Sequence, residues 1–319
     1  MVVTPDELGG VCAMMPAFTT PDGDRPDATN TIDVAALTDA VDRMIRDGAD
    51  MIATGGSFGE FHTLLWEEQQ TLIEATVQAV RKRVPVFIGY TALHTRDVLQ
   101  KMRFIQDSGA DGVLAGVPFY YQATVANAVQ FYHDLAEAFP NLGVMVYHNP
   151  PMHKVTLPVS AVLEIAKPRN VVAIKDSHRD PLAMIRQIES LRGQMSVFVH
   201  QTQMYPHAML GVAGCWSIYA WCGPEPLVRL RDACRAGDWE LAKQICLDIQ
   251  AATSDPTSTD LQWRENTHKL AINQAGYCHA GPLRPPFRHV PPELHERAAR
   301  RAQAWRALVE KYRPAAVGA

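Results

Sequence analysis

The segment Val171-Val172-Ala173-Ile174-Lys175-Asp176 carries a lysine at the end of a short apolar run. A continuous run of Val, Ile and Ala is typical of a strand that is buried on both faces, as in a parallel sheet covered by helices. An ammonium group at the end of such a strand is poorly hydrated, which favours the neutral amine, and a neutral lysine amine attacks carbonyl carbons to form Schiff bases. The segment therefore predicts a buried strand and a nucleophilic Lys175. The alternative is a lysine whose stem is buried and whose ammonium group reaches water.

Similar apolar runs recur along the chain and leave room for a helix between them. The eight strand candidates cover residues 11–18, 51–54, 84–90, 112–117, 143–147, 171–175, 196–201 and 212–218. Helical periodicity is found between them, for example over residues 32–46, 66–80, 95–106 and 125–139. Strands that alternate with helices imply a parallel sheet, and eight such units are what a (β/α)8 TIM barrel requires.

Two glycine-containing tetrapeptides and the C-terminal part of the chain add to this predicted fold. The tetrapeptides Asp-Gly-Ala-Asp (47–50) and Ser-Gly-Ala-Asp (108–111) precede the second and fourth strands, and each predicts a helix that ends just before its glycine. After Pro226 the strand pattern stops, and helical patterns cover residues 227–235, 239–252, 266–275 and 292–312. We therefore expect an α/β fold, with a (β/α)8 barrel over residues 1–226 and a C-terminal helical extension over residues 227–319.

Composition and charge exclude several classes of function. The 319 residues include 30 Lys and Arg against 34 Asp and Glu, so the chain lacks the basic excess of a nucleic-acid-binding protein. No apolar run approaches the roughly 20 residues that span a bilayer, and Asp6 and Glu7 are unlike the start of a signal peptide. We expect a cytoplasmic protein without membrane or nucleic-acid partners. The six cysteines show no C-x-x-C spacing, so neither zinc nor disulfides are expected.

Three features should meet at the carboxyl ends of the barrel strands, where TIM-barrel active sites lie. They are Gly56-Ser57-Phe58-Gly59-Glu60 after the second strand, Tyr147-His148-Asn149-Pro150 at the end of the fifth, and Lys175 at the end of the sixth. The glycine-rich turn offers backbone N–H groups and a hydroxyl just before a helix that begins near Trp66, which suits a carboxylate. Tyr147 adds a phenol that can transfer protons. A carboxylate beside an electrophilic carbonyl describes a 2-oxo acid. Taken singly, the turn and the tyrosine also fit an ordinary loop and a core aromatic.

A family resemblance follows from the order of four motifs. Gly-Ser-Phe-Gly-Glu (56–60), Pro-Phe-Tyr-Tyr (118–121), Tyr-His-Asn-Pro (147–150) and Ile-Lys-Asp (174–176) resemble the dihydrodipicolinate synthase and N-acetylneuraminate lyase superfamily of Schiff-base aldolases. The resemblance implies that Lys175 forms an imine with a 2-oxo acid, that Tyr147 transfers protons, and that Ser57 and Gly56 bind the carboxylate. It also implies that no cofactor is needed beyond the imine, and a homotetramer in which Tyr120 or Tyr121 reaches a neighbouring subunit's site.

Two departures from that family narrow the substrate. Phe58 stands where many members have a second hydroxyl, and Met152 or its neighbour stands where the dihydrodipicolinate enzymes have an arginine. Further apolar residues near the expected mouth are Phe119, Trp216, Tyr219 and Trp221. An apolar, aromatic wall favours a flat aryl substrate over a sugar acid.

A narrower resemblance lies in the last strand and the tail. Cys215-Trp216-Ser217, Gly223-Pro224-Glu225-Pro226 and the segment 276–286 (Gly-Tyr-Cys-His-Ala-Gly-Pro-Leu-Arg-Pro-Pro) are similar to the hydratase-aldolases that act on benzylidenepyruvates. The resemblance implies substrate contacts from Asn149, Trp216, Ser217 and His279. An asparagine tends to replace His279 in the hydroxybenzylidenepyruvate branch, and a histidine can pair with an ortho-carboxylate. The expected substrate is trans-2′-carboxybenzalpyruvate, cleaved to 2-carboxybenzaldehyde and pyruvate. The alternatives are trans-o-hydroxybenzylidenepyruvate, another pyruvate aldolase reaction, and a His279 that merely lies on the surface.

Other classes of function compete with an aldolase. Gly55 to Gly59 match G-x-S-x-G, the nucleophile elbow of serine hydrolases, but Ser57 follows the second strand and no His-Gly-Gly-Gly segment precedes it. His148, His153, His178 and His200 match no metal-ligand spacing. A barrel that binds a keto acid as a sensor, without catalysis, is the third alternative.

Overall fold

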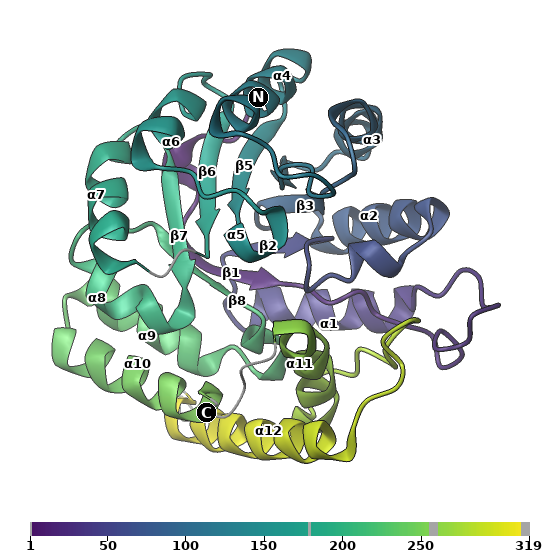
Figure 1. Cartoon of the computed structure of the whole chain (residues 1–319). Coiled ribbons are helices and arrows are strands. Elements are labelled where there is room, and N and C mark those ends of the chain that lie inside the picture. Colours follow the sequence, from purple (N-terminus) through teal and green to yellow (C-terminus); the bar gives the residue numbers. More distant parts are fainter. Residues whose placement is uncertain (1, 178–179, 255–260, 314–319) are drawn as a thin grey trace.

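The computed structural model describes residues 2–177, 180–254 and 261–313. Eight parallel strands pair in chain order, and β1 pairs with β8 to close the barrel (Figure 1). The predicted TIM barrel is confirmed. The strands are β1 (Gly10–Met14), β2 (Met51–Thr54), β3 (Val86–Tyr90), β4 (Gly112–Ala115), β5 (Gly143–His148), β6 (Val171–Asp176), β7 (Ser196–His200) and β8 (Gly214–Ser217).

Helices follow the strands and cover the outside of the barrel. They are α1 (Val34–Arg46), α2 (Trp66–Val80), α3 (Thr95–Asp107), α4 (Val125–Ala138), α5 (Pro150–His153), α6 (Val159–Ile165), α7 (Pro181–Leu191), α8 (Met204–Ala208), α9 (Glu225–Ala236), α10 (Trp239–Thr253), α11 (Leu261–Ala275) and α12 (Pro292–Tyr312). Side-chain caps explain several starts: the oxygens of Asp33, Thr124 and Asp238 accept N–H groups of the first turns of α1, α4 and α10. Short 3₁₀ turns η1 (Pro5–Glu7), η2 (Phe61–Thr63), η3 (Gln201–Gln203) and η4 (Tyr219–Cys222) lie in the connections.

The two glycines predicted to follow helix ends do so in the left-handed region. Gly48 follows α1 with φ of 103° and Gly109 follows α3 with φ of 86°. A side chain is strained at such angles, so glycine ends each helix where the chain must turn back into the sheet. Both predicted joints are confirmed.

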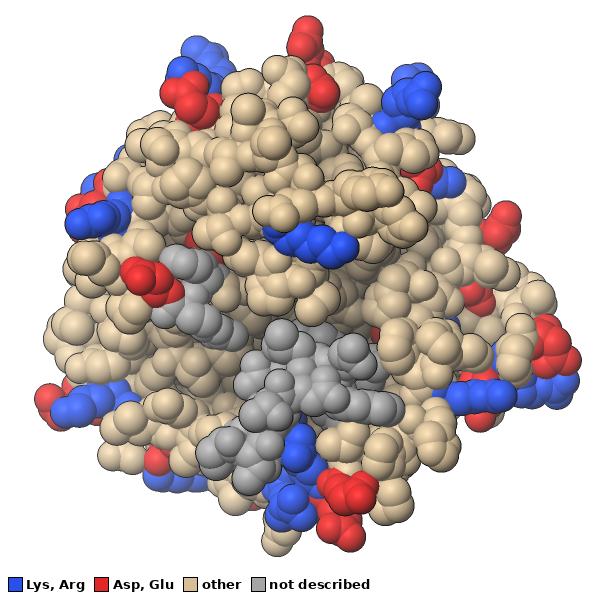
Figure 2. Space-filling model, viewed as in Figure 1, with Lys and Arg blue, Asp and Glu red and all other residues tan. Residues whose placement is uncertain are grey.

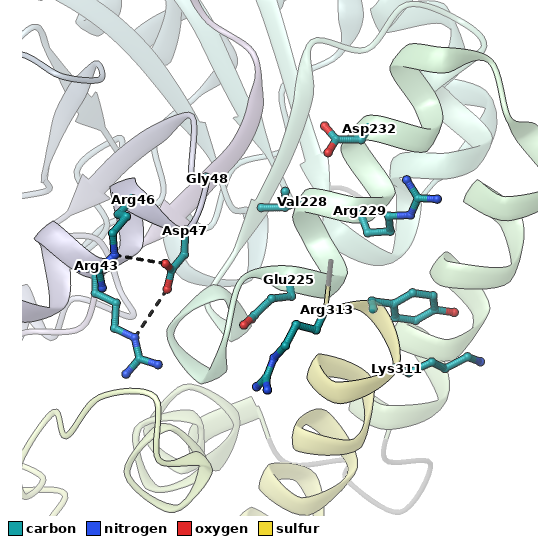
Figure 3. Close-up of a pocket in the computed structure, with 11 residues that line it drawn as sticks. Arg43, Arg46, Asp47, Gly48, Glu225, Val228, Arg229, Asp232, Lys311 and Arg313 are labelled. Carbon is teal, nitrogen blue, oxygen red and sulfur yellow. Dashed lines mark ion pairs between the residues drawn. The ribbon is translucent and has the colours of Figure 1, made fainter. Parts of the chain in front are cut away.

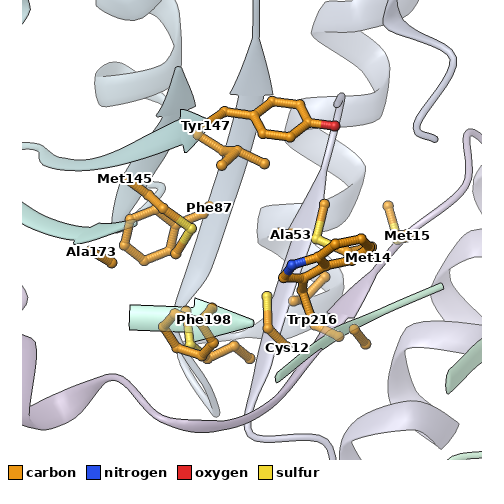
Figure 4. Close-up of a cluster of buried hydrophobic side chains, with 14 of the residues drawn as sticks. Cys12, Met14, Met15, Ala53, Phe87, Met145, Tyr147, Ala173, Phe198 and Trp216 are labelled. Carbon is orange, nitrogen blue, oxygen red and sulfur yellow. The ribbon is translucent and has the colours of Figure 1, made fainter. Parts of the chain in front are cut away.

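The interior of the barrel is filled by apolar side chains below the mouth. Cys12, Met14, Phe87, Met145 and Phe198 belong to one cluster, with Tyr147 above it in the view and Trp216 beside Met14 (Figure 4). All five are at most 3% exposed. Burial of side chains of this size contributes roughly 1.5–3 kcal/mol each, and it leaves a dry floor under the mouth. The chain's six cysteines are free thiols, and burial raises the pKa of Cys12 to about 12.

The last helices lie against one side of the barrel. α9 packs on β1, α12 packs on α9, α10 and α11, and α11 and α12 also pack on η4. In Figure 1 they form the green and yellow layer below β8 and beside α1. A boundary between barrel and extension at residue 226 stays a prediction.

Charge is spread without a dominant sign on the face seen in Figure 2. Side chains of both signs lie mostly around its rim, and the centre is largely neutral or not described. Within the described part of the chain, no helix has the length and apolar character needed to cross a membrane. The expected cytoplasmic location stays a prediction.

Candidate active site

Lys175 lies near the carboxyl end of β6 and is 3% exposed. Its Nζ atom is 4.0 Å from the centre of the Tyr147 ring and 3.9 Å from the centre of the Trp216 ring. The amine is therefore held between two aromatic faces, close to the dry interior of the barrel. Such an enclosure fixes the position of the amine and offers a flat aromatic surface on either side of it.

The sheet register fixes this arrangement. Tyr147 and Lys175 are directly paired between β5 and β6. Trp216 comes from β8, and its indole N–H donates to the backbone carbonyl of Asp176 at 3.2 Å. Both aromatic rings therefore belong to barrel strands and not to the connecting loops, which favours fixed positions beside the lysine.

The phenol of Tyr147 links two further predicted residues. Its oxygen is 3.2 Å from Ser57 Oγ and accepts a hydrogen bond from Asn149 Nδ2 at 3.0 Å. Since Asn149 donates, the phenol hydrogen is left to point at Ser57 or at a reacting group. The barrel thus brings together Lys175, Tyr147, Ser57, Asn149 and Trp216, although the role of each in chemistry stays a prediction.

Close backbone packing explains the glycines in the turn after β2. Gly55 has φ of 69°, and a Cβ on it would lie 2.3 Å from the carbonyl oxygen of Gly89 on β3. A Cβ on Gly59 would lie 2.5 Å from the Gly55 nitrogen. At Gly56 an added Cβ would meet the Tyr147 ring at an ordinary 3.7 Å. The turn is therefore folded tightly on itself and rests against the phenol.

His153 supports Tyr147 from the following helix. Its Nδ1–H donates to the Tyr147 carbonyl at 3.1 Å, and the two rings meet edge to face with centres 4.9 Å apart. Burial lowers the pKa of His153 to about 4, the bond to the carbonyl opposes this, and the positive charge of Lys175 lowers the pKa further. The imidazole is therefore neutral at physiological pH and acts as a fixed donor.

A second histidine, His148, follows Tyr147 at the end of β5. His148 Nε2 accepts the backbone N–H of Leu157, so Nδ1 carries the proton and donates to Asp176 Oδ1 at 3.0 Å. Gln187 of α7 donates to the other oxygen of Asp176 at 2.7 Å. These buried contacts join β5, β6 and α7 at the residues that directly follow Tyr147 and Lys175.

The other predicted residues lie outside this cluster, and their roles stay predictions. Phe58 is 6% exposed and meets the His268 ring edge to face, with centres 6.4 Å apart. Ser217 is buried and donates to Gln201. Tyr120 and Tyr121 are 67% and 84% exposed. His279 is exposed, next to Ala280, whose carbonyl accepts the Thr19 N–H beyond β1.

The histidines weighed as metal ligands do not gather into one site. His148 and His153 make the contacts described above, His200 bonds to Thr202 at 2.7 Å, and His178 lies outside the described residues. In the described part of the chain, no three His, Cys, Asp or Glu side chains are grouped as metal ligands would be.

Sequence reasoning missed a set of buried charges beside the glycine-rich turn. Glu60 ends that turn and pairs with Lys269 at 2.6 Å and with Arg284 at 3.3 Å. The two cations lie 209 and 224 residues further along the chain. Only the packing of the tail on the barrel brings them together, so no local pattern could have indicated the contact.

A hollow elsewhere on the molecule is not part of this cluster. It has a volume of about 940 Å³ and lies between the end of α1, the start of α9 and the end of α12 (Figure 3). Asp47 pairs there with Arg43 and Arg46, each at 3.6 Å. Gly48, just before β2, lines it, so the hollow lies towards the amino ends of the strands, opposite the mouth.

Comparison with known proteins adds independent findings. A family profile described as the Dihydrodipicolinate synthetase family matches residues 13–304. The trans-O-hydroxybenzylidenepyruvate hydratase-aldolase of Pseudomonas putida is 34% identical over 97% of this chain and 96% of that protein. The trans-2'-carboxybenzalpyruvate hydratase-aldolase of Nocardioides sp. (strain KP7) is 27% identical, with 97% and 96% covered. A solved structure of PhdJ bound to a substrate intermediate has a TM-score of 0.92 and 31% identity, covering 97% of this chain and 99% of that one. The similarity thus extends through both the barrel and the tail.

Proposed function

Because the chain belongs to the dihydrodipicolinate synthetase family and is a carbon–carbon lyase of the aldolase type, we propose that it is a Schiff-base hydratase-aldolase that cleaves benzylidenepyruvates. The products are an aromatic aldehyde and pyruvate. The single observation that carries the proposal is the position of Lys175 Nζ between the rings of Tyr147 and Trp216. An imine formed there has a phenol on one side and a flat indole face on the other.

The first half of the reaction builds the electron sink. Lys175 Nζ adds to the keto carbon, and loss of water from the carbinolamine leaves a protonated imine conjugated with the alkene. Ser57 Oγ and backbone N–H groups of the turn hold the carboxylate of the keto acid. The imine draws electrons from the benzylic carbon, so water adds there and the carbon next to the imine takes up a proton.

The second half breaks the carbon–carbon bond. Tyr147 removes the proton of the new hydroxyl, the bond breaks, and its electron pair moves into the imine to give an enamine. The aldehyde leaves, the enamine carbon is protonated, and hydrolysis releases pyruvate and the free amine of Lys175. The imine withdraws the electrons throughout, so the proposal needs no cofactor.

The benzylidenepyruvate is further proposed to carry an ortho substituent on its aromatic ring. We infer a 2′-carboxylate because His279, next to Ala280 whose carbonyl accepts the Thr19 N–H, offers a ring N–H donor. The 34% identical relative supports a second candidate, an ortho-hydroxyl. The ratio of kcat/KM for the two substrates decides between them. We expect His279→Asn to lower that ratio of carboxylate to hydroxyl substrate, and an unchanged ratio contradicts a role for His279.

The test of the function is turnover of a benzylidenepyruvate. The conjugated substrate absorbs in the near ultraviolet, and cleavage should remove that absorbance while aldehyde and pyruvate appear in equal amounts. Absence of any change with the carboxylated, hydroxylated and unsubstituted compounds would contradict the proposal. Binding without turnover would favour a keto-acid sensor.

A serine hydrolase is the rival that uses the same turn. A nucleophilic serine is paired with a base, usually histidine, whereas Ser57 Oγ faces the phenol of Tyr147. We therefore expect a fluorophosphonate probe to leave Ser57 unlabelled, and labelling would favour the hydrolase.

A homotetramer is proposed as the assembly, with small-molecule substrates as the other partners. The exposed Tyr120 and Tyr121 rings support a contact with a neighbouring subunit, since large aromatic side chains are enriched at interfaces. Light scattering of the purified protein tests this, and a monomer at micromolar concentration contradicts it.

A further inference from the structure

Four charged side chains are buried together where the helical tail meets the mouth of the barrel. They are Glu60 and Glu68 from the segment after β2, and Lys269 and Arg284 from the tail; each is at most 6% exposed. Two negative and two positive groups balance one another. Buried charges persist in a fold when they are paired or hydrogen-bonded. Glu60 pairs with both cations, and Glu68 accepts the backbone N–H groups of Thr31 and Leu65 at 2.8 and 2.9 Å.

Lys269 of α11 has three oxygen partners. Its Nζ atom donates to Glu60 Oε2 at 2.6 Å, to Thr19 Oγ1 at 2.5 Å and to the Ala17 carbonyl at 3.0 Å. Burial lowers the pKa of Lys269 to about 8 although Glu60 opposes that change, so the ammonium form prevails at neutral pH. One ammonium therefore joins the segment after β1 to the turn after β2.

Arg284 makes the parallel contact from the loop that follows α11. Its guanidinium donates to the carbonyls of Ala17, Phe18 and Thr31 at 3.1, 3.2 and 2.7 Å, and to Glu60 at 3.3 Å. The planar group has five donors, so it reaches more partners at once than the three donors of a lysine allow.

Glu60 connects this cluster to the keto-acid site. It has a left-handed backbone with φ of 54°, and its N–H donates to the Ser57 carbonyl at 3.2 Å. A non-glycine residue is held at such an angle only when its surroundings determine it. The neighbouring tail residue His268 also meets Phe58 of the same turn. Lys269 and His268 thus contact both ends of the segment Phe58 to Glu60.

We infer that Lys269 and Arg284 are positioning residues for the keto-acid pocket: through Glu60 they hold the glycine-rich turn so that Ser57 and its N–H groups face the carboxylate. The tail then helps to form the active site in addition to packing against the barrel. This inference rests on the proposed function, because it assumes that the turn binds the carboxylate of a 2-oxo acid.

The test measures binding of pyruvate by trapping its imine with sodium borohydride. The pyruvate concentration that gives half-maximal trapping is compared between the wild type and Lys269→Met. A matched control is Arg231→Met, since Arg231 of α9 also ties the tail to the barrel, pairing with Asp50 at 2.7 Å, but at the opposite end of the strands. Arg284→Lys is the milder second variant, which keeps the charge and loses the planar fork.

We expect Lys269→Met to raise the half-saturating pyruvate concentration about 10-fold or more. That is the effect expected when the released turn loses one hydrogen bond to the carboxylate of pyruvate. The maximal amount of trapped imine should change much less. Arg284→Lys should also raise the half-saturating pyruvate concentration. Arg231→Met should lower stability and leave the half-saturating concentration unchanged. Unchanged half-saturation in both folded variants overturns the inference, as does an equal shift in Arg231→Met. Failure of both variants to fold would assign the cluster to stability and also overturns it. If the wild type traps no pyruvate, the proposed function fails instead.

Discussion

Tyr147 OH lies 3.2 Å from Ser57 Oγ, so a side chain of β5 and one of the turn after β2 meet across the mouth of the barrel. The same ring lies 4.0 Å from the Lys175 amine. One phenol therefore stands between the group proposed to bind the carboxylate and the group proposed to attack the carbonyl. A 2-oxo acid carries its carboxylate and its keto group on adjacent carbons, so it can reach both protein groups at once.

Replacement of Tyr147 by phenylalanine tests its role in proton transfer. The ring that packs on Lys175 is kept and only the hydroxyl is lost, so we expect kcat to fall about 10²- to 10⁴-fold. Tyr132→Phe is the matched control, because it removes another buried phenol, which donates to the Ala115 carbonyl at 3.0 Å outside the site. It should cost roughly 1 kcal/mol of stability and leave kcat unchanged. Equal kcat in Tyr147→Phe and the wild type would remove Tyr147 from the mechanism.

Ser57→Ala should weaken binding more than chemistry. Loss of one hydrogen bond to a carboxylate costs about 1.5–3 kcal/mol, which corresponds to a rise in KM of about 10- to 100-fold. Steady-state kinetics measures the change, and circular dichroism checks that the fold is intact. A variant whose KM is unaffected would show that the turn does not hold the carboxylate.

His153 predicts a pH dependence of stability. Its pKa is lowered to about 4 by burial, whereas an unfolded histidine titrates near 6.5. Between these values the unfolded chain binds a proton that the folded protein does not, so the free energy of unfolding should decrease as the pH falls, by roughly 3 kcal/mol in total. Above pH 6.5 this contribution is constant.

Urea unfolding at pH 7 and at pH 4.5 measures the effect of His153. His153→Gln keeps a donor near the Tyr147 carbonyl but cannot titrate, so its stability should change less between the two pH values. An equal change in variant and wild type would assign the acid sensitivity to other groups.

Chelation tests the electron sink. Because the imine withdraws the electrons in the proposed reaction, incubation with EDTA should leave kcat and KM unchanged. A large loss of activity that zinc restores would contradict the scheme.

The strands were predictable because burial imposes a simple pattern on them. β2 covers residues 51–54 and α2 begins at Trp66, as the apolar runs and the helical periodicity indicate. Once eight alternating units define a barrel, topology alone places Ser57, Tyr147 and Lys175 at one end. That part of the site depends on the order of the elements and not on details of packing.

The remainder depends on contacts between distant segments. Ser217 follows Trp216 on β8, and neighbouring residues on a strand point to opposite faces, so the serine bonds to Gln201 while the indole covers the lysine. The pairing of Glu60 with Lys269 requires the tail to fold back over the mouth. A single sequence contains no signal for such a contact, because neither residue belongs to a local pattern that the other completes.

The most direct test of the central claim is to map the lysine that forms the imine. The protein is incubated with pyruvate, reduced with sodium borohydride, digested and analysed by mass spectrometry. We predict a pyruvyl adduct on Lys175 in the wild type and none in Lys175→Ala, whose aldehyde release should also be abolished. An adduct on a different lysine, or undiminished aldehyde release by Lys175→Ala, would contradict the account.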